Sequence, residues 1–242
     1  MKKPLEGKAA VITGGNSGIG KAIAAALAEA GCRLTIAGRR GKMNEEVAED
    51  LRRKTGAAVT PVTADVSKEE DCRRLIDSAV KEMGRIDILV NNAGIGGGGS
   101  VESTGTETFD RVMKTNLYGP FWCSREAFPH LRKNPVDKAT GLRGSIVNIS
   151  SLAGKEAWGG QATYSCSKFG VIALTQALAD EGREELIRAT AICPALVSTP
   201  MTGVSGSDYI TPEDIAATVT YLLNLSAAAW PTEIVLPRRG AT

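Results

Sequence analysis

The sequence predicts an α/β protein with a doubly wound parallel sheet, and three observations support this fold class. Short apolar segments alternate with longer segments of helical periodicity along the whole chain, which is the pattern of consecutive β-α-β units. The apolar segments are almost continuously hydrophobic, as expected for strands that are covered on both faces. No internal repeat and no linker rich in Pro, Ser and Gly divides the 242 residues, so residues 1–242 are expected to form a single domain.

In the first half of the chain, strands and helices follow from local composition. The segment "KAAVIT" contains β-branched residues and predicts the first strand, and the Ala-rich "GKAIAAALAEAG" predicts the first helix. Pro61 weakens the prediction of the third strand, because proline cannot donate to a sheet ladder. Strands are expected at 8–13, 32–38, 58–65 and 86–94, and helices at 20–31, 44–56 and 68–84.

In the second half, a long helix is expected at 106–132, with an interruption at Gly119-Pro120. Thr211 followed by Pro212 marks the start of the last helix, since proline is tolerated at the first helical position. The remaining strands are expected at 143–151, 186–194 and 232–237, and the remaining helices at 160–182 and 211–225. The complete pattern predicts a seven-stranded parallel sheet with helices on both faces.

Composition argues against several classes of function. An aromatic content of 5% and a net charge of +2 provide neither the stacking surface nor the basic patch that nucleic-acid binding needs. The five cysteines form no C-x-x-C pair and His130 is the single histidine, so no metal site is expected. The apolar run near the N-terminus is too short for a signal peptide, and no stretch of about 18 apolar residues occurs. We therefore expect no membrane span and a cytoplasmic location.

The segment "TGGNSGIG" at 13–20 follows the first expected strand and opens the first helix. Its glycines allow a tight turn and a close approach of backbone to a ligand, and a helix N-terminus offers N–H groups to a pyrophosphate. At the first β-α turn of a doubly wound sheet this predicts dinucleotide binding rather than a plain turn. A literal G-x-G-x-x-G also occurs at Gly94, Gly96 and Gly99, but no helix opens directly behind it, so we interpret it as a glycine-rich loop.

The residues about 20 positions beyond this turn indicate which dinucleotide binds, because an acid there holds the ribose 2′-hydroxyl of NAD. The position falls on Gly38-Arg39-Arg40, which contains no acid. An arginine at this point pairs with a 2′-phosphate, so NADP (NADPH) is favoured, with Arg39 a better candidate than Arg40. The alternative is that both arginines are solvated residues leading into a helix and that the cofactor is NAD.

With these residues in hand, the chain resembles the short-chain dehydrogenase/reductase family from about residue 8 to residue 201. Ser151 and Tyr164 are 13 residues apart, the usual spacing in the family. Each motif alone is weak, but their common order is specific. In order along the chain they are "TGGNSGIG", Asp65-Val66, "NNAG" at 91–94, Asn116 in "MKTNLYG", Ser151 in "NISSLAG", Tyr164 and Lys168 in Y-x-x-x-K, and "CPALVST" at 193–199.

The resemblance implies a Rossmann fold and a set of catalytic residues. Tyr164 is implied as the general acid/base and Ser151 as the residue that polarises the substrate oxygen. Lys168 is implied to promote ionisation of the phenol and to hold the nicotinamide ribose, and Asn116 to help hold a water for a proton relay. Independently of the family, a spacing of four residues places Tyr164 and Lys168 on one helix face, and a nearby ammonium favours a phenolate.

The resemblance also implies a set of cofactor contacts, in which Asp65 hydrogen-bonds adenine. Two features depart from the family pattern: Ala195 follows Pro194 where a glycine is usual, and the C-terminal "WPTEIVLPRRGAT" lacks the frequent V-D-G-G. The residues expected to bind the cofactor are Gly14, Asn16, Ser17, Gly18, Ile19, Gly20, Arg39, Arg40, Asp65, Val66, Asn92, Ala93, Gly94, Tyr164, Lys168, Pro194, Val197 and Thr199.

We therefore expect an NADP-dependent oxidoreductase that interconverts a carbonyl and a secondary alcohol, such as a 3-oxoacyl thioester reductase or a broad carbonyl reductase. The alternatives are the same chemistry with NAD, or a catalytically idle dinucleotide-binding regulator. The helices at 106–132 and 160–182 predict, by resemblance, a homodimer or homotetramer. The loop at 195–210 is expected to be mobile and to close over an apolar substrate. Candidate substrate contacts are Leu152, Trp158, Leu196 and Met201.

Overall fold

The computed structural model of the protein describes residues 5–239 and contains one seven-stranded sheet. The strand order is β3-β2-β1-β4-β5-β6-β7, and each neighbouring pair is parallel. This confirms the predicted sheet. The strands are β1 (Ala9–Thr13), β2 (Arg33–Gly38), β3 (Val59–Thr63), β4 (Ile88–Asn91), β5 (Gly144–Ile149), β6 (Ile187–Pro194) and β7 (Glu233–Leu236).

The helices begin and end at residues that explain their limits. α2 and α3 both end at a glycine in the left-handed conformation, Gly56 and Gly84, which terminates a helix without a Cβ clash. Thr211 and Asp214 form a capping box at the start of α7, with Pro212 at the first helical position, as predicted. The helices are α1 (Gly18–Glu29), α2 (Gly41–Thr55), α3 (Glu69–Met83), α4 (Thr106–Met113), α5 (Gly119–Arg132), α6 (Ala162–Glu181) and α7 (Pro212–Leu223).

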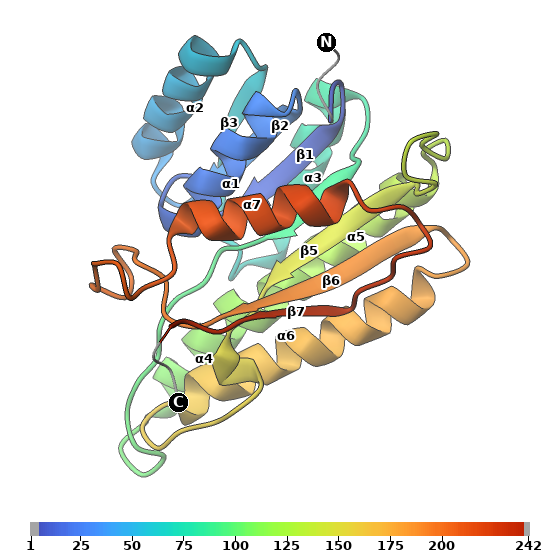
Figure 1. The fold of residues 1–242 in the computed structure, drawn as a ribbon. Helices are drawn as coiled ribbons and strands as arrows, with labels where there is room; N and C mark the ends of the chain where they lie inside the picture. Colours follow the sequence, from blue (N-terminus) through green and yellow to red (C-terminus); the bar gives the residue numbers. More distant parts are fainter. Residues whose placement is uncertain (1–4, 240–242) are drawn as a thin grey trace.

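Helices lie on both faces of the sheet (Figure 1). Within residues 5–239 the sheet separates two large apolar cores, one beneath each layer of helices. Helices α1, α2 and α7 cover one face, and α3, α5 and α6 cover the other. Alternation along β4 shows the division, because Ile88 and Val90 pack in the first core and Leu89 packs in the second. Coverage of both faces explains why the strands read as continuous apolar segments.

The weak point predicted at Pro61 lies on an edge of the sheet. Among the described residues β3 pairs only with β2, where Pro61 is in register with Ile36. A proline is tolerated there because no further strand needs its missing N–H.

The predicted long helix at 106–132 is interrupted, but not where the sequence indicated. A π-helical turn, Lys114–Tyr118, separates α4 from α5, and Gly119 and Pro120 instead begin α5. The amide of Gly119 donates to the carbonyl of Lys114, five residues back. Pro120 has no N–H to donate to the carbonyl of Asn116 and its ring would crowd that carbonyl in an α-helix, so the chain widens just before the proline.

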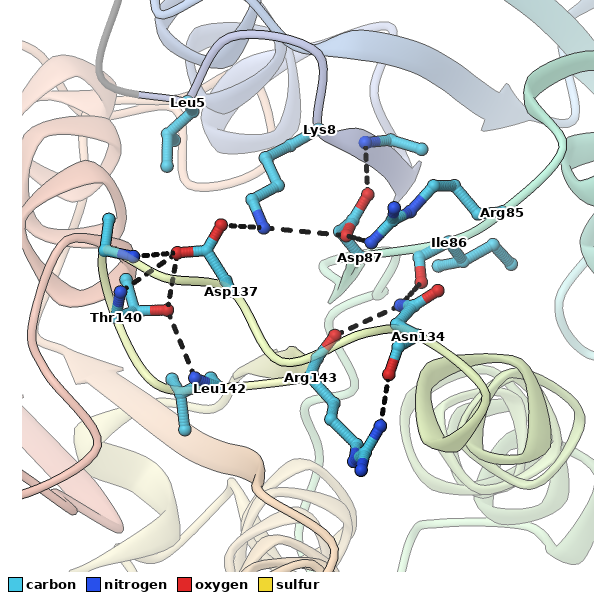
Figure 2. A network of polar contacts seen from close by, with 12 residues as sticks. Leu5, Lys8, Arg85, Ile86, Asp87, Asn134, Asp137, Thr140, Leu142 and Arg143 are labelled. Carbon is cyan, nitrogen blue, oxygen red and sulfur yellow. Dashed lines mark hydrogen bonds and ion pairs between the residues drawn. The ribbon is translucent and has the colours of Figure 1, made fainter.

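A network of ion pairs lies at the amino ends of β1 and β4 (Figure 2). The ammonium of Lys8 lies 2.7 Å from Asp137 and 3.7 Å from the buried Asp87. Asp87 also accepts hydrogen bonds from the guanidinium of Arg85 and from the backbone amide of Ala9. The network attaches the loop after α5 to the sheet. It leaves the carboxyl ends of the strands, where doubly wound proteins bind their ligands, free of these charges.

Candidate active site

The turn between β1 and α1 has the geometry of an anion-binding site. Gly14 and Gly18 have φ angles of +66° and +49°, a region that favours glycine. Helix α1 begins at Gly18, with no acid in its first turn and no side chain capping it. Its first N–H groups, including those of Ile19 and Gly20, are therefore available to a phosphate.

Asn92, from the loop after β4, joins that loop to the glycine-rich turn. Its Nδ2 donates to the carbonyls of Thr13 at 2.9 Å and Gly14 at 3.3 Å. The hydroxyl of Thr13 in turn accepts from the amides of Asn92 and Ala93, both at 3.0 Å. A Cβ at Gly20 would collide with Asn92 Nδ2, so this glycine allows the close approach of the two segments.

Tyr164 and Lys168 lie together near the start of α6, as predicted. The Nζ of Lys168 is 5.6 Å from the centre of the Tyr164 ring. The same ammonium donates to the carbonyl of Ile149, at the end of β5, at 2.8 Å. Lys168 is buried and Tyr164 is half-buried, so the phenol is accessible while the cation beneath it is held in place.

Ser151 lies two residues after the end of β5, where a short 3₁₀ turn, Leu152–Gly154, begins. Its Oγ accepts from the amide of Ala153 at 3.1 Å. The turn packs closely on α6, because a Cβ at Gly154 would lie 2.7 Å from the carbonyl oxygen of Lys168. Ser150 donates to that same carbonyl at 3.0 Å. These contacts hold the strand end that carries Ser151 against the helix that carries Tyr164 and Lys168.

Asn116 lies in the π-helical turn and uses its side-chain amide for structure. Its Oδ1 accepts from the amide of Ile95 at 2.8 Å, and its Nδ2 donates to the carbonyl of Ile95 at 2.9 Å and to the Oγ of Ser167 at 3.1 Å. A Cβ at Gly94 would lie 3.4 Å from Asn116 Oδ1 and 3.8 Å from Lys168 Nζ. Gly94 of "NNAG" thus lies beside both Asn116 and Lys168. The backbone carbonyl of Asn116 lacks its usual α-helical donor, because Pro120 has no N–H.

Arg39 and Arg40, the two residues expected to bind the 2′-phosphate, follow β2 directly, and both are exposed. Among residues 5–239 neither guanidinium has a hydrogen bond or ion pair.

Asp65 accepts from the amide and hydroxyl of Ser67 through one carboxylate oxygen. Val66, the next residue, is buried.

At the far side of the turn, Thr199 lies close to Gly18, because a Cβ there would be 3.4 Å from the Thr199 methyl group. Pro194 ends β6. Val197 is buried and forms a β-bridge with Ile210. The segment after β6 therefore closes against the turn after β1.

Three loops extend beyond the carboxyl ends of neighbouring strands. The loops that follow β4, β5 and β6 all project from the same side of the molecule, at the left of the view (Figure 1). The amide of Gly99 donates to the carbonyl of Gly160 at 2.9 Å, which joins the glycine-rich loop to the segment before α6. No helix opens directly behind this loop, as the sequence indicated. Exposed apolar side chains on the loops are Val101, Trp158, Leu196 and Met201, while Leu152 is half-buried.

The cysteines near the site do not form a reactive pair. Cys166 is exposed between the two helical residues Tyr164 and Lys168, and Cys193 is buried in β6. Burial, and to a lesser extent the negative charge of Glu233, raises the pKa of the Cys193 thiol. Within residues 5–239, no group of three or more His, Cys, Asp or Glu side chains is arranged to hold a metal ion, and no helix is long and apolar enough to cross a membrane.

Sequence reasoning missed two residues that hold the site. Ser167 is fully buried, accepts from Asn116 and donates to the carbonyl of Tyr164 at 2.7 Å. Asn44, in α2, accepts a hydrogen bond from Asn16. A signal for Asn44 existed, because it occupies an i, i+3, i+4, i+7 position on the buried face of its helix, where an apolar residue is expected.

The family model described as "short chain dehydrogenase" matches residues 8–209. The chain belongs to the short-chain dehydrogenase/reductase family. This short-chain dehydrogenase/reductase is 32% identical to an uncharacterized oxidoreductase of Methylorubrum extorquens over 98% of both chains. It is 34% identical to a 3-oxoacyl-(acyl-carrier-protein) reductase of Chlamydia muridarum over 92% of both chains.

A solved structure gives a similar result for the fold. The alcohol dehydrogenase of Thermococcus sibiricus, complexed with 5-hydroxy-NADP, superposes with a TM-score of 0.87 at 27% identity and covers 97% of each chain. The protein described here is thus an oxidoreductase of this family, and the family uses NAD or NADP.

Proposed function

We propose that the protein is an NADP-dependent oxidoreductase that interconverts a carbonyl and a secondary alcohol, with Tyr164 as the general acid/base. The observation that carries the proposal is the position of the Lys168 ammonium, 5.6 Å from the Tyr164 ring and beside Gly94 of the loop that is bonded to the glycine-rich turn. These contacts would bring a nicotinamide bound along that turn toward the phenol. A regulator that only bound the dinucleotide would not need this arrangement.

The residues present fit a nicotinamide dinucleotide. The open N-terminus of α1 suits the pyrophosphate, and the exposed Arg39 and Arg40 suit a 2′-phosphate. Asp65, after β3, would bind the adenine, and Pro194, Val197 and Thr199 would contact the nicotinamide end. The remaining residues of the turn and of "NNAG" would contact the part of the cofactor between them. When bound, the cofactor supplies or accepts the hydride.

The protein's own groups handle the proton and the substrate oxygen. In the direction of reduction, the Tyr164 hydroxyl donates a proton to the oxygen of the carbonyl while Ser151 donates a hydrogen bond to it. The Lys168 ammonium stabilises the phenolate that results. The backbone carbonyl of Asn116 accepts a hydrogen bond from a water that connects Lys168 with solvent. Through this water and Lys168, a proton from solvent returns to Tyr164.

The substrate proposed is an apolar ketone or 3-oxoacyl thioester. Trp158, Leu196 and Met201 are exposed apolar side chains on the loops after β5 and β6, and the Chlamydia muridarum relative is a 3-oxoacyl reductase. The first test is oxidation of NADPH with a panel of ketones and 3-oxoacyl thioesters. Binding of NADPH without reduction of any carbonyl would favour the regulator instead.

Replacing Tyr164 by Phe removes the proposed acid and leaves the ring in place. We expect Tyr164→Phe to lower kcat by about a thousandfold, within the range typical of general acid–base catalysis, and to change the Kd of NADPH by less than about twofold. Tyr221→Phe is the matched control, because Tyr221 is exposed on α7, away from the turn. Substantial turnover by Tyr164→Phe would contradict the role of this residue.

The cofactor assignment is tested at Arg39. Loss of a charge-assisted contact to the 2′-phosphate costs about 1.5–3 kcal/mol, so Arg39→Ala should weaken NADPH binding about tenfold or more and leave NADH binding nearly unchanged. Arg73→Ala, an exposed arginine on α3, controls for loss of a surface charge. If the ratio of the two affinities is the same in Arg39→Ala and wild type, Arg39 does not select the cofactor.

A further inference from the structure

Asn44 is a buried amide at a position where the helix otherwise buries apolar side chains. Only 1% of its surface is exposed. A buried amide is costly unless each of its polar atoms is paired. The other residues on the buried face of α2 are Val47, Ala48 and Leu51.

The hydrogen bonds of Asn44 connect the ends of three segments. Its Nδ2 donates to the carbonyls of Gly38 at 2.8 Å and Val62 at 2.9 Å, at the ends of β2 and β3. Its Oδ1 accepts from Asn16 Nδ2 at 2.6 Å. Both of its amide hydrogens and its oxygen are thereby used, and the glycine-rich turn after β1 becomes bonded, through one side chain, to the ends of the two neighbouring strands.

Gly38 leaves room for this connection. A Cβ at Gly38 would collide with Asn16 Nδ2 and would lie 2.9 Å from Asn44 Oδ1. Position 38 also falls in the stretch where an NAD-binding fold carries its ribose-binding acid. No such acid fits there while Asn16 and Asn44 are bonded to each other.

We propose that Asn44 is a positioning residue for recognition of the 2′-phosphate. By joining Asn16 to the carbonyl of Gly38, it fixes Arg39 and Arg40 relative to the glycine-rich turn that receives the pyrophosphate. The inference rests on the proposed NADP preference, and extends it to a residue that touches no cofactor atom itself.

The test measures binding of 2′,5′-ADP and 5′-ADP by calorimetry, which reports on the 2′-phosphate without turnover. Wild type should bind 2′,5′-ADP more tightly than 5′-ADP, and the ratio of the two affinities should fall about tenfold in Asn44→Leu. Asn134→Leu is the matched control: Asn134 is also buried and also donates to two carbonyls, those of Ile86 and Arg143, but at the opposite end of the sheet (Figure 2). Asn134→Leu should unfold at a lower urea concentration than wild type and should keep the wild-type preference for 2′,5′-ADP.

A second arm leaves Asn44 in place, so it decides the matter even if Asn44→Leu does not fold. Gly38→Ala should weaken 2′,5′-ADP binding about tenfold in the wild-type background, because its methyl group displaces Asn16. The loss should be much smaller in an Asn16→Ala background, because the two changes act on one contact.

Two results overturn the inference: a folded Asn44→Leu with the wild-type preference, or a Gly38→Ala variant that binds 2′,5′-ADP as tightly as wild type. A wild-type protein that binds both nucleotides equally refutes the NADP assignment itself, and the inference with it. That measurement on wild type alone distinguishes the two failures.

Discussion

Individual polar residues at the carboxyl end of the sheet are held mainly by backbone groups. Lys168 donates to the carbonyl of Ile149, and the amide of Asn116 bonds both backbone groups of Ile95. Backbone partners are fixed by the strands and helices to which they belong, so these side chains have little freedom before a ligand arrives. The proposed site is therefore preorganised at the level of single residues.

At the other end of the sheet, a single ion pair has a predictable dependence on pH. The Lys8 ammonium, with the amides of Thr140 and Ala139, lowers the pKa of Asp137 to about 2. A carboxyl whose folded-state pKa is lowered contributes stability above its unfolded pKa of about 3.9, and this contribution disappears as the pH falls through about 2.

Asp137→Asn should therefore lower the free energy of unfolding at pH 7 by about 1 kcal/mol, less than the full pKa shift because the partly exposed pair is screened by solvent. The difference from wild type should shrink between about pH 4 and pH 2. Urea unfolding at several pH values measures it, with Asp208→Asn, a far more exposed aspartate, as control. A difference independent of pH would show that the charge of Asp137 is not the cause.

Among the secondary-structure elements, the π-helical turn Lys114–Tyr118 does the most to shape the site. It packs closely on α6, since a Cβ at Gly170 would lie 2.7 Å from Leu117. It also turns Asn116 toward Ile95 and leaves the Asn116 carbonyl without its α-helical donor at Pro120. π-helical turns are frequent at functional sites, and this one carries a proposed catalytic residue.

Pro120→Ala tests the role of this element. The new N–H can bond the Asn116 carbonyl and favour a regular α-helix, so we expect kcat to fall about tenfold while stability is unchanged or higher, because alanine favours a helix far more than proline. Pro129→Ala, a second proline inside the same helix, is the matched control and should leave kcat at the wild-type value. If Pro120→Ala has the wild-type kcat, the carbonyl of Asn116 takes no part in the proton relay.

For the whole molecule, the most informative surface is the one formed by the π-helical turn, α5 and α6. Tyr118, Phe121 and Phe169 are each more than two-fifths exposed there. Exposed apolar side chains that gather on one face indicate a protein–protein contact, and resemblance to the family predicts a homodimer or homotetramer through these helices.

Phe121→Glu places a charge on this surface and should shift the protein toward the monomer, measured as molar mass by light scattering at several concentrations. Val101→Glu, on a loop and 78% exposed, should keep the wild-type mass. An identical mass for wild type and Phe121→Glu would place any subunit contact elsewhere.

The sequence alone allowed the order of strands and helices, the first β-α turn and the shared face of Tyr164 and Lys168 to be predicted. The interruption of the long helix was placed at Gly119-Pro120, although the irregular turn precedes it. The error is physical, because proline acts on the carbonyl four residues before it and thus distorts the chain on its N-terminal side.

Features that depend on near neighbours in the chain could be predicted from the sequence: periodicity, helix starts and ends, glycine-dependent turns and the spacing of motifs. The groups that hold the site in place became known only from the packing of distant segments. Asn116 meets Ile95 across 21 residues, and Asn16 meets Asn44 across 28. Such contacts form only when β-α units pack side by side on the sheet, and local periodicity carries no information about the partner that a packed side chain will find.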